Sequence, residues 1–179
     1  MGRAAFTKLA SRTGLKQVKT LYLMRHAKSS WKDATLSDRQ RPLNKRGQRD
    51  APEMGRRLRD KGIVLDRILS SPARRALNTA QLVAQAVDYP IEGIDQSEAL
   101  YFSSTSTILA LIQQLDERWS TVLLVSHNPD ISALLQRLCH SDIDDMPTAA
   151  IATLQFDWQW HDIHDGSGRL SDYDLPKNR

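Results

Sequence analysis

Two histidines and three arginines follow the ends of three apolar runs in this 179-residue chain. They are Arg25 and His26 after residues 20–24, Arg74 and Arg75 after residues 66–70, and His127 after residues 121–125. A guanidinium group presents a planar fork of donors that matches two phosphate oxygens and stays charged at any working pH. A neutral imidazole attacks phosphorus, and a protonated one donates a hydrogen bond. Together these residue types predict a site for phosphoryl transfer through a histidine.

The cations of this set can stabilise an in-line transition state without help from a metal ion. A zinc site would need carboxylate or thiolate ligands at regular spacing, and none accompany His26 or His127. We therefore expect neither a metal nor a cofactor.

Secondary structure has to bring these segments together. The apolar runs predict buried strands, which we place at residues 20–24, 66–70 and 121–125, with further strands at 91–94 and 149–156. Helical patterns separate them, and we place these helices from Asn44 to about Lys61, from Ser71-Pro72 to about Val87, from Thr105 to Trp119, and from Pro129 to about His140. Asn44 and Ser71 are the expected N-caps, and Pro52 allows a kink or a later start of the first helix.

Strands that alternate with helices predict a single-domain α/β fold, a three-layer α/β/α sandwich with a mainly parallel sheet. Open sheets of this kind bind ligands at the carboxyl ends of their strands, so the three segments should meet at one edge. We divide the chain into a basic extension at residues 1–19, a domain at residues 20–160 and a polar C-terminal tail at residues 161–179. The extension is expected to be disordered, and the tail to be an edge element or disordered.

The extension explains the positive charge of the chain. The formal charge is +4, and the extension holds five basic residues and no acid, so the remainder carries −1. Nucleic-acid binding is therefore not expected. The single cysteine, the lack of a signal-like apolar stretch and the lack of an apolar run of about 20 residues predict a cytoplasmic protein without a membrane span. The extension also loosely matches an organellar transit peptide, which stays open as an alternative.

Four segments, in order, resemble the motifs of the histidine phosphatase superfamily, which includes the phosphoglycerate mutases. They are Arg25-His26-Ala27, Arg41-Pro42-Leu43-Asn44-Lys45-Arg46-Gly47, Ser71-Pro72-Ala73-Arg74-Arg75-Ala76 and Ser126-His127-Asn128-Pro129. The resemblance covers about residues 20 to 140, and within the superfamily it is greatest to the small SixA-type phosphohistidine phosphatases. It implies a phosphoglycerate mutase-like fold.

The resemblance also implies roles for individual residues. His26 is the expected phosphoryl acceptor, and Arg25, Arg75 and His127 are expected to hold the phosphate, with Arg75 selected over Arg74. Ser29 and Asn128 are added as substrate-binding residues. Glu98 is the candidate general acid by position, against a role as a helix cap or a surface residue. A phosphoramidate has a basic leaving nitrogen that needs little help from an acid, and SixA-type enzymes similarly lack a clear acid.

Two positions depart from the family pattern. Ala27 replaces the usual glycine, and it would be strained if the backbone needed a positive φ there. Ser126 replaces a glycine and is expected to add a hydroxyl donor to the pocket.

The leading interpretation is a metal-independent phosphatase that acts on phosphohistidine in proteins through a phosphohistidine intermediate. A phosphatase or mutase for small phosphate esters is the first alternative, although so short a chain has little material for a lid. A phosphate-binding module without catalysis is the second. The expected partner is a phosphorylated protein or a small phosphorylated substrate, not nucleic acid or a membrane, and the expected state is a monomer or weak dimer.

Overall fold

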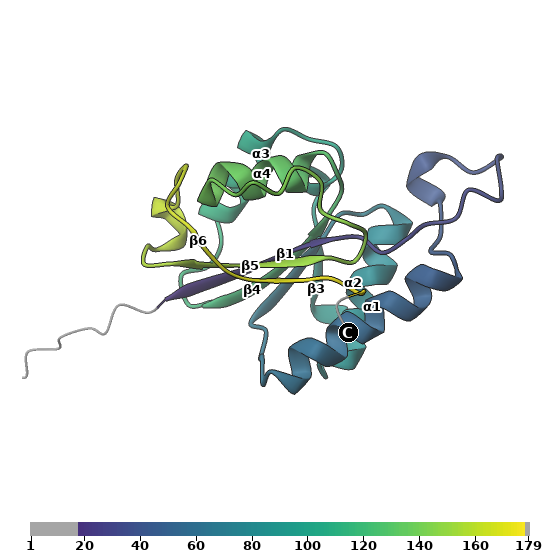
Figure 1. Cartoon of the computed structure of the whole chain (residues 1–179), viewed down its shortest axis with the longest axis horizontal. Helices are drawn as coiled ribbons and strands as arrows, with labels where there is room; N and C mark the ends of the chain where they lie inside the picture. The colour runs from purple at the N-terminus through teal and green to yellow at the C-terminus, as the bar shows by residue number, and fades with distance from the viewer. Residues whose placement is uncertain (1–17, 178–179) are drawn as a thin grey trace, which may run out of the picture.

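A six-stranded sheet forms the centre of the structure, a computed structural model that describes residues 18–177 (Figure 1). Its strands are β1 (Lys19–Arg25), β2 (Arg67–Ser70), β3 (Ile94–Gln96), β4 (Thr121–Ser126), β5 (Ile151–Phe156) and β6 (Arg169–Asp174). The strand order across the sheet is β3-β2-β4-β1-β5-β6. Strands β1 to β4 run parallel, whereas β5 and β6 run antiparallel to their neighbours. The predicted mainly parallel sheet is therefore confirmed, with an antiparallel pair at one side.

Helices cover both faces of this sheet and complete the predicted three-layer sandwich (Figure 1). They are α1 (Lys45–Asp60) and α2 (Arg74–Ala86) on one face, and α3 (Thr105–Gln113) and α4 (Asp130–Cys139) on the other. Successive side chains of a strand point to opposite faces. Leu21 and Leu23 of β1 thus join the core under α3 and α4, while Tyr22 and Met24 join the core under α1 and α2. Burial on both faces explains why the central strands are continuous apolar runs.

The three chemistry-bearing segments follow neighbouring strands. Strands β2, β4 and β1 lie side by side, and their register pairs Arg25 with Ser126 and Ser70 with Val125. Because these strands are parallel, their carboxyl ends reach the same edge of the sheet. The fold thus brings the residues after each strand to one place.

The first helix follows its sequence signals closely. The Asn44 side chain accepts a hydrogen bond from the Gly47 amide at 2.9 Å, which makes Asn44 the N-cap. Helix α1 continues through Pro52 without a later start.

Several predicted boundaries are wrong. Residues 91–93 form a 3-10 helix after Pro90, so β3 begins only at Ile94. Helix α2 begins at Arg74 with Ala73 at the N-cap position, because the Ser71 hydroxyl contacts His127. Helix α3 ends at Gln113 rather than Trp119, and a turn held by the Asp116 carboxylate follows it. Strand β5 begins at Ile151, because the φ of Ala149 is 65° and lies outside the extended region.

The two ends of the chain differ from our division in detail. The basic extension predicted at residues 1–19 lies outside the described residues, except for its last two. Lys19 belongs to β1 and is fully buried, and its ammonium donates to the carbonyl oxygens of Glu117 and Trp119 at 2.5 and 2.8 Å. The polar tail carries β6, which forms the edge of the sheet beside β5. Within residues 18–177, no helix is both long and apolar enough to cross a membrane.

Candidate active site

The His26 imidazole lies just beyond β1 and is 9% exposed. Its Nδ1 lies 2.7 Å from the Ala27 carbonyl oxygen. A carbonyl oxygen only accepts hydrogen bonds, so Nδ1 carries the proton and Nε2 keeps its lone pair. Burial lowers the pKa of His26 to about 4, and the positive charge of Arg75 acts in the same direction, against the hydrogen bond to Ala27. His26 is therefore neutral at pH 7, and its Nε2 is unprotonated.

Arg75 stands beside this nitrogen. It lies in the first turn of α2, is 2% exposed, and its Nε donates to His26 Nε2 at 3.2 Å. The neighbouring Arg74 is exposed and does not line the cavity that contains His26. The structure thus places Arg75, and not Arg74, beside the His26 imidazole.

His127 follows β4 and faces His26, with 4.9 Å between the ring centroids. Its Nε2 lies 2.7 Å from the Ser71 hydroxyl oxygen, which itself accepts a hydrogen bond from the Ala73 amide. Ser71 can therefore donate its own proton to Nε2, which leaves the ring proton of a neutral His127 on Nδ1. Burial lowers the pKa of His127 to about 2, with the charges of His26 and Arg75 acting in the same direction.

Two buried nitrogens of the site lack a hydrogen-bond partner among the described residues. They are Nδ1 of His127 and Nε of Arg25. The Nη1 atom of Arg25 is held by the Met146 carbonyl oxygen at 2.6 Å and by the Asp145 carboxylate at 3.2 Å. Buried donors nearly always have a partner, so these two atoms match the oxygens of a bound oxyanion.

A cavity of about 310 Å³ joins these groups. Its lining includes Arg25, His26, Arg75 and His127, together with Ser29 and Asn128, so the structure brings all these predicted residues together. The Ser29 hydroxyl accepts from Arg41 Nη2 at 2.6 Å, and the Asn128 amide oxygen accepts from the Ser132 hydroxyl at 2.7 Å. Two exposed aromatic rings, Trp31 and Phe102, stand at the rim of the cavity.

Glu98 is the one predicted site residue that lies apart. Its carboxylate forms two hydrogen bonds with Arg39, of 2.5 and 3.1 Å, its side chain is 69% exposed, and it does not line the cavity. The same segment instead contributes Phe102, whose ring stacks on His127 with 5.0 Å between centroids.

Asp38 is a site residue that the sequence analysis missed. Its carboxylate accepts from Arg75 Nη2 and Arg41 Nη1 at 2.8 Å and from the Tyr101 hydroxyl at 3.1 Å. Burial would raise the pKa of Asp38, but the hydrogen bond and charge of Arg75 outweigh it and lower the pKa. Asp38 lies in a polar loop far from any predicted strand end, and no sequence pattern sets it apart from the neighbouring acids.

The two departures from the family pattern have clear outcomes. Ala27 is fully buried, its amide donates to the Thr79 hydroxyl at 3.0 Å, and it is not among the residues with positive φ, so it is unstrained. The predicted hydroxyl donor at Ser126 is wrong: this side chain donates to the Leu100 carbonyl oxygen at 2.9 Å and does not line the cavity. Within residues 18–177, no group of three or more His, Cys, Asp or Glu side chains is arranged to hold a metal ion.

Known proteins are similar to this chain in sequence and in fold. The sequence profile of the histidine phosphatase superfamily (branch 1) matches residues 21–99. An uncharacterized protein of Mycobacterium tuberculosis is 32% identical over 164 residues, which cover 86% of this chain and 100% of that protein. The phosphohistidine phosphatase SixA of Escherichia coli is 29% identical over 139 residues, or 76% of this chain and 85% of SixA. A solved structure of the protein histidine phosphatase SixA with tungstate has a TM-score of 0.76 and 27% identity, and covers 88% of this chain and 97% of that one.

Proposed function

Because this chain belongs to the histidine phosphatase superfamily and is a phosphatase, we propose that it hydrolyses phosphohistidine in proteins, with His26 as the transient phosphoryl acceptor. The observation that carries the proposal is the state of His26. It is buried and neutral, its proton is fixed on Nδ1, and its Nε2 lies in a cavity lined by Arg25, Arg75 and His127. Likeness to SixA, a phosphohistidine phosphatase, supports the choice of substrate.

The reaction proceeds in two displacements. In the first, the lone pair of His26 Nε2 attacks phosphorus, the P–N bond of the substrate breaks, and the freed imidazole nitrogen takes up a proton from solvent water. Arg75 Nε, which binds His26 Nε2 in this structure, then donates to a phosphoryl oxygen. In the second, water attacks the phosphorus of phosphorylated His26, which releases phosphate and regenerates the imidazole. Arg25 and His127 supply the two unpartnered donors that hold the equatorial oxygens in both steps.

The charge that develops on the phosphoryl group is met by Arg25, Arg75 and the His127 N–H, so the proposed reaction uses no metal ion. Ser29 and Asn128 complete the lining as substrate-binding residues. The role predicted for Glu98 stays a prediction, and the position of its carboxylate, bound to Arg39 outside the cavity, favours a reaction without an acid at this position. A phosphoramidate suits such a site because its leaving nitrogen is basic.

The open rim fits a side chain presented by another protein. Trp31 and Phe102 are 73% and 51% exposed and flank the entrance, where they can contact a protein surface or stack on the imidazole of the substrate. We accordingly propose a phosphorylated protein as the partner and the cytoplasm as the compartment. A monomer or weak dimer is the proposed state.

Trapping the intermediate tests this proposal. Rapid acid-free quenching during turnover of an aryl phosphate, followed by mass spectrometry, should find one phosphoryl group on His26, and His26→Ala should abolish both the adduct and the activity. Chelation of metals should leave the rate unchanged. Phosphohistidine should be hydrolysed in preference to phosphoserine and sugar phosphates. A clear preference for the esters would overturn the proposed substrate while leaving the phosphatase mechanism intact.

A further inference from the structure

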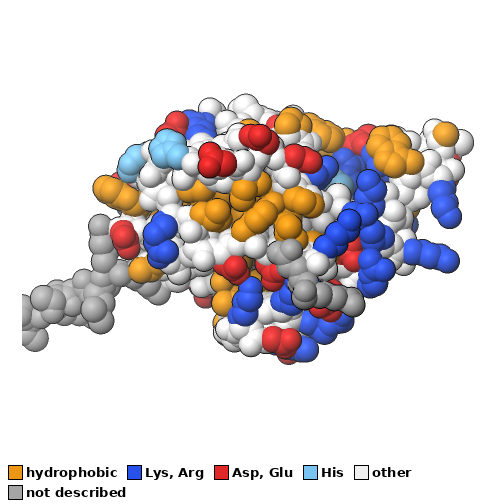
Figure 2. Space-filling model, viewed as in Figure 1, with side chains coloured by type: hydrophobic (Ala, Val, Ile, Leu, Met, Phe, Trp, Pro, Cys, Tyr) orange, Lys and Arg blue, Asp and Glu red, His pale blue; other side chains and the backbone are white. Residues whose placement is uncertain are grey.

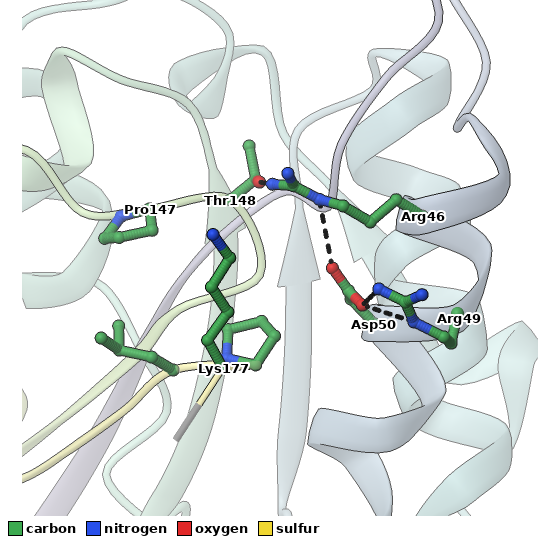
Figure 3. A pocket seen from close by; sticks show the side chains of 8 residues that line it. Arg46, Arg49, Asp50, Pro147, Thr148 and Lys177 are labelled. Carbon is green, nitrogen blue, oxygen red and sulfur yellow. Dashed lines mark hydrogen bonds and ion pairs between the residues drawn. The ribbon is translucent and has the colours of Figure 1, made fainter. Parts of the chain in front are cut away.

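A second cavity lies directly beside the catalytic one, and the proposed function does not use it. It has a volume of about 190 Å³, and we call it the basic groove. Its labelled lining residues in Figure 3 are Arg46, Arg49, Asp50, Pro147, Thr148 and Lys177. Thr148 lines both cavities, so anything in the basic groove lies next to the phosphorylated side chain.

Positive charge exceeds negative charge in the basic groove. Arg46, Arg49 and Lys177 face a single carboxylate, that of Asp50. Asp50 is held by Arg49 at 3.0 and 3.1 Å and by Arg46 at 3.4 Å. The Lys177 ammonium has no hydrogen-bond or ion-pair partner among the described residues, and it points toward Thr148 in Figure 3. The groove therefore carries an excess of two positive charges.

Donors remain available for a ligand. Arg46 uses Nε for Asp50 and Nη2 for the Thr148 hydroxyl at 2.9 Å, and Arg49 uses Nε and Nη2 for Asp50. In each guanidinium group the Nη1 atom is left to bind an incoming anion. Lysine and arginine side chains also gather on the face shown in Figure 2, next to an apolar patch.

The shape and charge of the groove favour a carboxylate side chain. Pro147, Leu175 and Pro176 provide apolar surface for the methylene groups of a glutamate or the backbone of a peptide. The Asp50 side chain, only 9% exposed, repels a dianion such as a second phosphate more strongly than it repels a carboxylate. A nucleic acid would need a basic surface far larger than this groove, and residues 20–179 together carry a net charge of −1.

We propose that the basic groove binds an acidic residue of the substrate protein, within a few residues of the phosphorylated histidine. This inference rests on the proposed function, because it assumes that the substrate is a protein. The groove would then select among phosphorylated proteins by their flanking sequence, while the cavity around His26 performs the same reaction on each.

A pair of peptides tests the inference. Both contain one histidine in the same backbone, flanked by glutamates in one peptide and by glutamines in the other. We expect the parent protein to hydrolyse the phosphorylated glutamate peptide with a kcat/KM roughly three- to tenfold higher, as suits two exposed charge contacts. This preference should shrink at high salt. Equal kcat/KM values for the two peptides would overturn the inference.

Variants of the basic groove test whether the preference for the glutamate peptide arises there. In R49E/K177E the preference for the glutamate peptide should vanish or reverse, whereas turnover of an aryl phosphate should stay unchanged and report that the fold is intact. The matched control is R56E/R59E, which makes the same change of charge at exposed positions of α1 that line neither cavity. A preference that survives in R49E/K177E, or that vanishes equally in the control, would contradict the groove. If the charge reversal disturbs folding, R49Q/K177Q makes the same test.

Failure of the proposed function gives a different result. If neither phosphopeptide is hydrolysed while aryl phosphates are, the protein substrate is wrong. Binding of the unphosphorylated, fluorescein-labelled peptides still examines the groove: tighter binding of the glutamate peptide, lost in R49E/K177E, supports it, and equal binding contradicts it.

Discussion

Burial and neighbouring cations, rather than a partner carboxylate, set the state of the His26 imidazole. Its Nδ1 donates to the backbone carbonyl of Ala27, so no acid is present at that nitrogen to favour the imidazolium form. The pKa is consequently lowered to about 4 instead of being raised. This arrangement keeps His26 neutral over a wide range of pH.

The pH profile of the reaction follows from this pKa. His26 must be neutral to attack, so kcat/KM should fall on the acid side only as the pH approaches about 4, not at the usual histidine value near 6.5. The measurement is kcat/KM between pH 4 and 8 for two aryl phosphates whose second phosphate pKa values differ, so that substrate ionisation can be separated. An acid limb near 6.5 that is the same for both substrates would contradict the assigned state of His26.

Asp38 binds Arg75, which is a phosphate ligand in the proposed reaction. Its carboxylate oxygen lies 2.8 Å from Arg75 Nη2, and its lowered pKa keeps it negatively charged at neutral pH. Asp38→Asn removes this negative charge, and we expect vanadate to inhibit the variant several-fold more strongly. Arg39→Gln is a suitable control, because Arg39 pairs with Glu98 and does not line the cavity. Weaker inhibition of Asp38→Asn would show instead that Asp38 is needed to position Arg75.

At the scale of elements, two glycines of α1 set how closely this helix approaches its neighbours. A Cβ atom at Gly47 would lie 2.3 Å from the carbonyl oxygen of Lys28, in the segment that leads to Ser29. A Cβ atom at Gly55 would lie 2.7 Å from the Cβ of Ala86 and 3.1 Å from the Val83 backbone in α2. The first contact supports the active-site loop, whereas the second supports only the packing of α1 on α2.

Substituting each glycine by alanine separates these contributions. Both changes should lower the free energy of unfolding by about 1–3 kcal/mol through overpacking, partly offset by the better helix propensity of alanine. Only Gly47→Ala should also reduce kcat/KM, because the Lys28 backbone must move. Denaturant unfolding and aryl phosphate turnover of the two variants check this. Equal activity of the two would mean that the loop adjusts without disturbing the cavity.

The site residues that could be predicted from the sequence are those that lie at the ends of strands or in the first turn of a helix. Arg25, His26 and His127 follow apolar strands, and Arg74 and Arg75 follow one after a short turn, so the apolar runs predicted that these residues lie at one edge. The choice of Arg75 over Arg74 came from the family resemblance. Glu98 and Asp38 belong to 3-10 helices at residues 98–100 and 38–40, whose side-chain directions depend on tertiary contacts such as those with Arg39 and Arg75. Sequence position could not show which of the two carboxylates faces the cavity.

The C-terminal segment shows the same limit for the fold. Strand β6 has only six residues and mostly polar side chains, so its hydrophobic pattern is weak. Its position depends on pairing with β5 and on two ion pairs. Arg57 of α1 binds Asp174 at 2.7 Å, and Lys61, the residue just after α1, binds Asp172 at 2.7 Å. These partners are more than 100 residues apart in the chain, so local sequence patterns cannot predict that they pair.

For the molecule as a whole, the buried histidines of the active site link folding to pH. The pKa values of His26 and His127 are lowered to about 4 and about 2 in the folded protein, whereas both are near 6.5 in the unfolded chain. Below pH 6.5 the unfolded chain therefore binds more protons than the folded protein. The contribution of these two histidines to the free energy of unfolding is therefore fully present above pH 6.5. It decreases as the pH falls toward their pKa values in the folded protein.

This linkage predicts an unusually early loss of stability in acid. Between pH 6 and 4.5, each histidine lowers the free energy of unfolding by up to about 1.4 kcal/mol for each pH unit that the pH falls. Most carboxylates are still ionised in this pH range. Urea unfolding at several pH values measures how the free energy of unfolding depends on pH. In His26→Asn this dependence should be weaker by the contribution of one histidine. A pH dependence that is unchanged in this variant would contradict the buried, neutral state of His26. The same burial that keeps His26 neutral, as the proposed reaction requires, thus lowers the stability of the folded protein in acid.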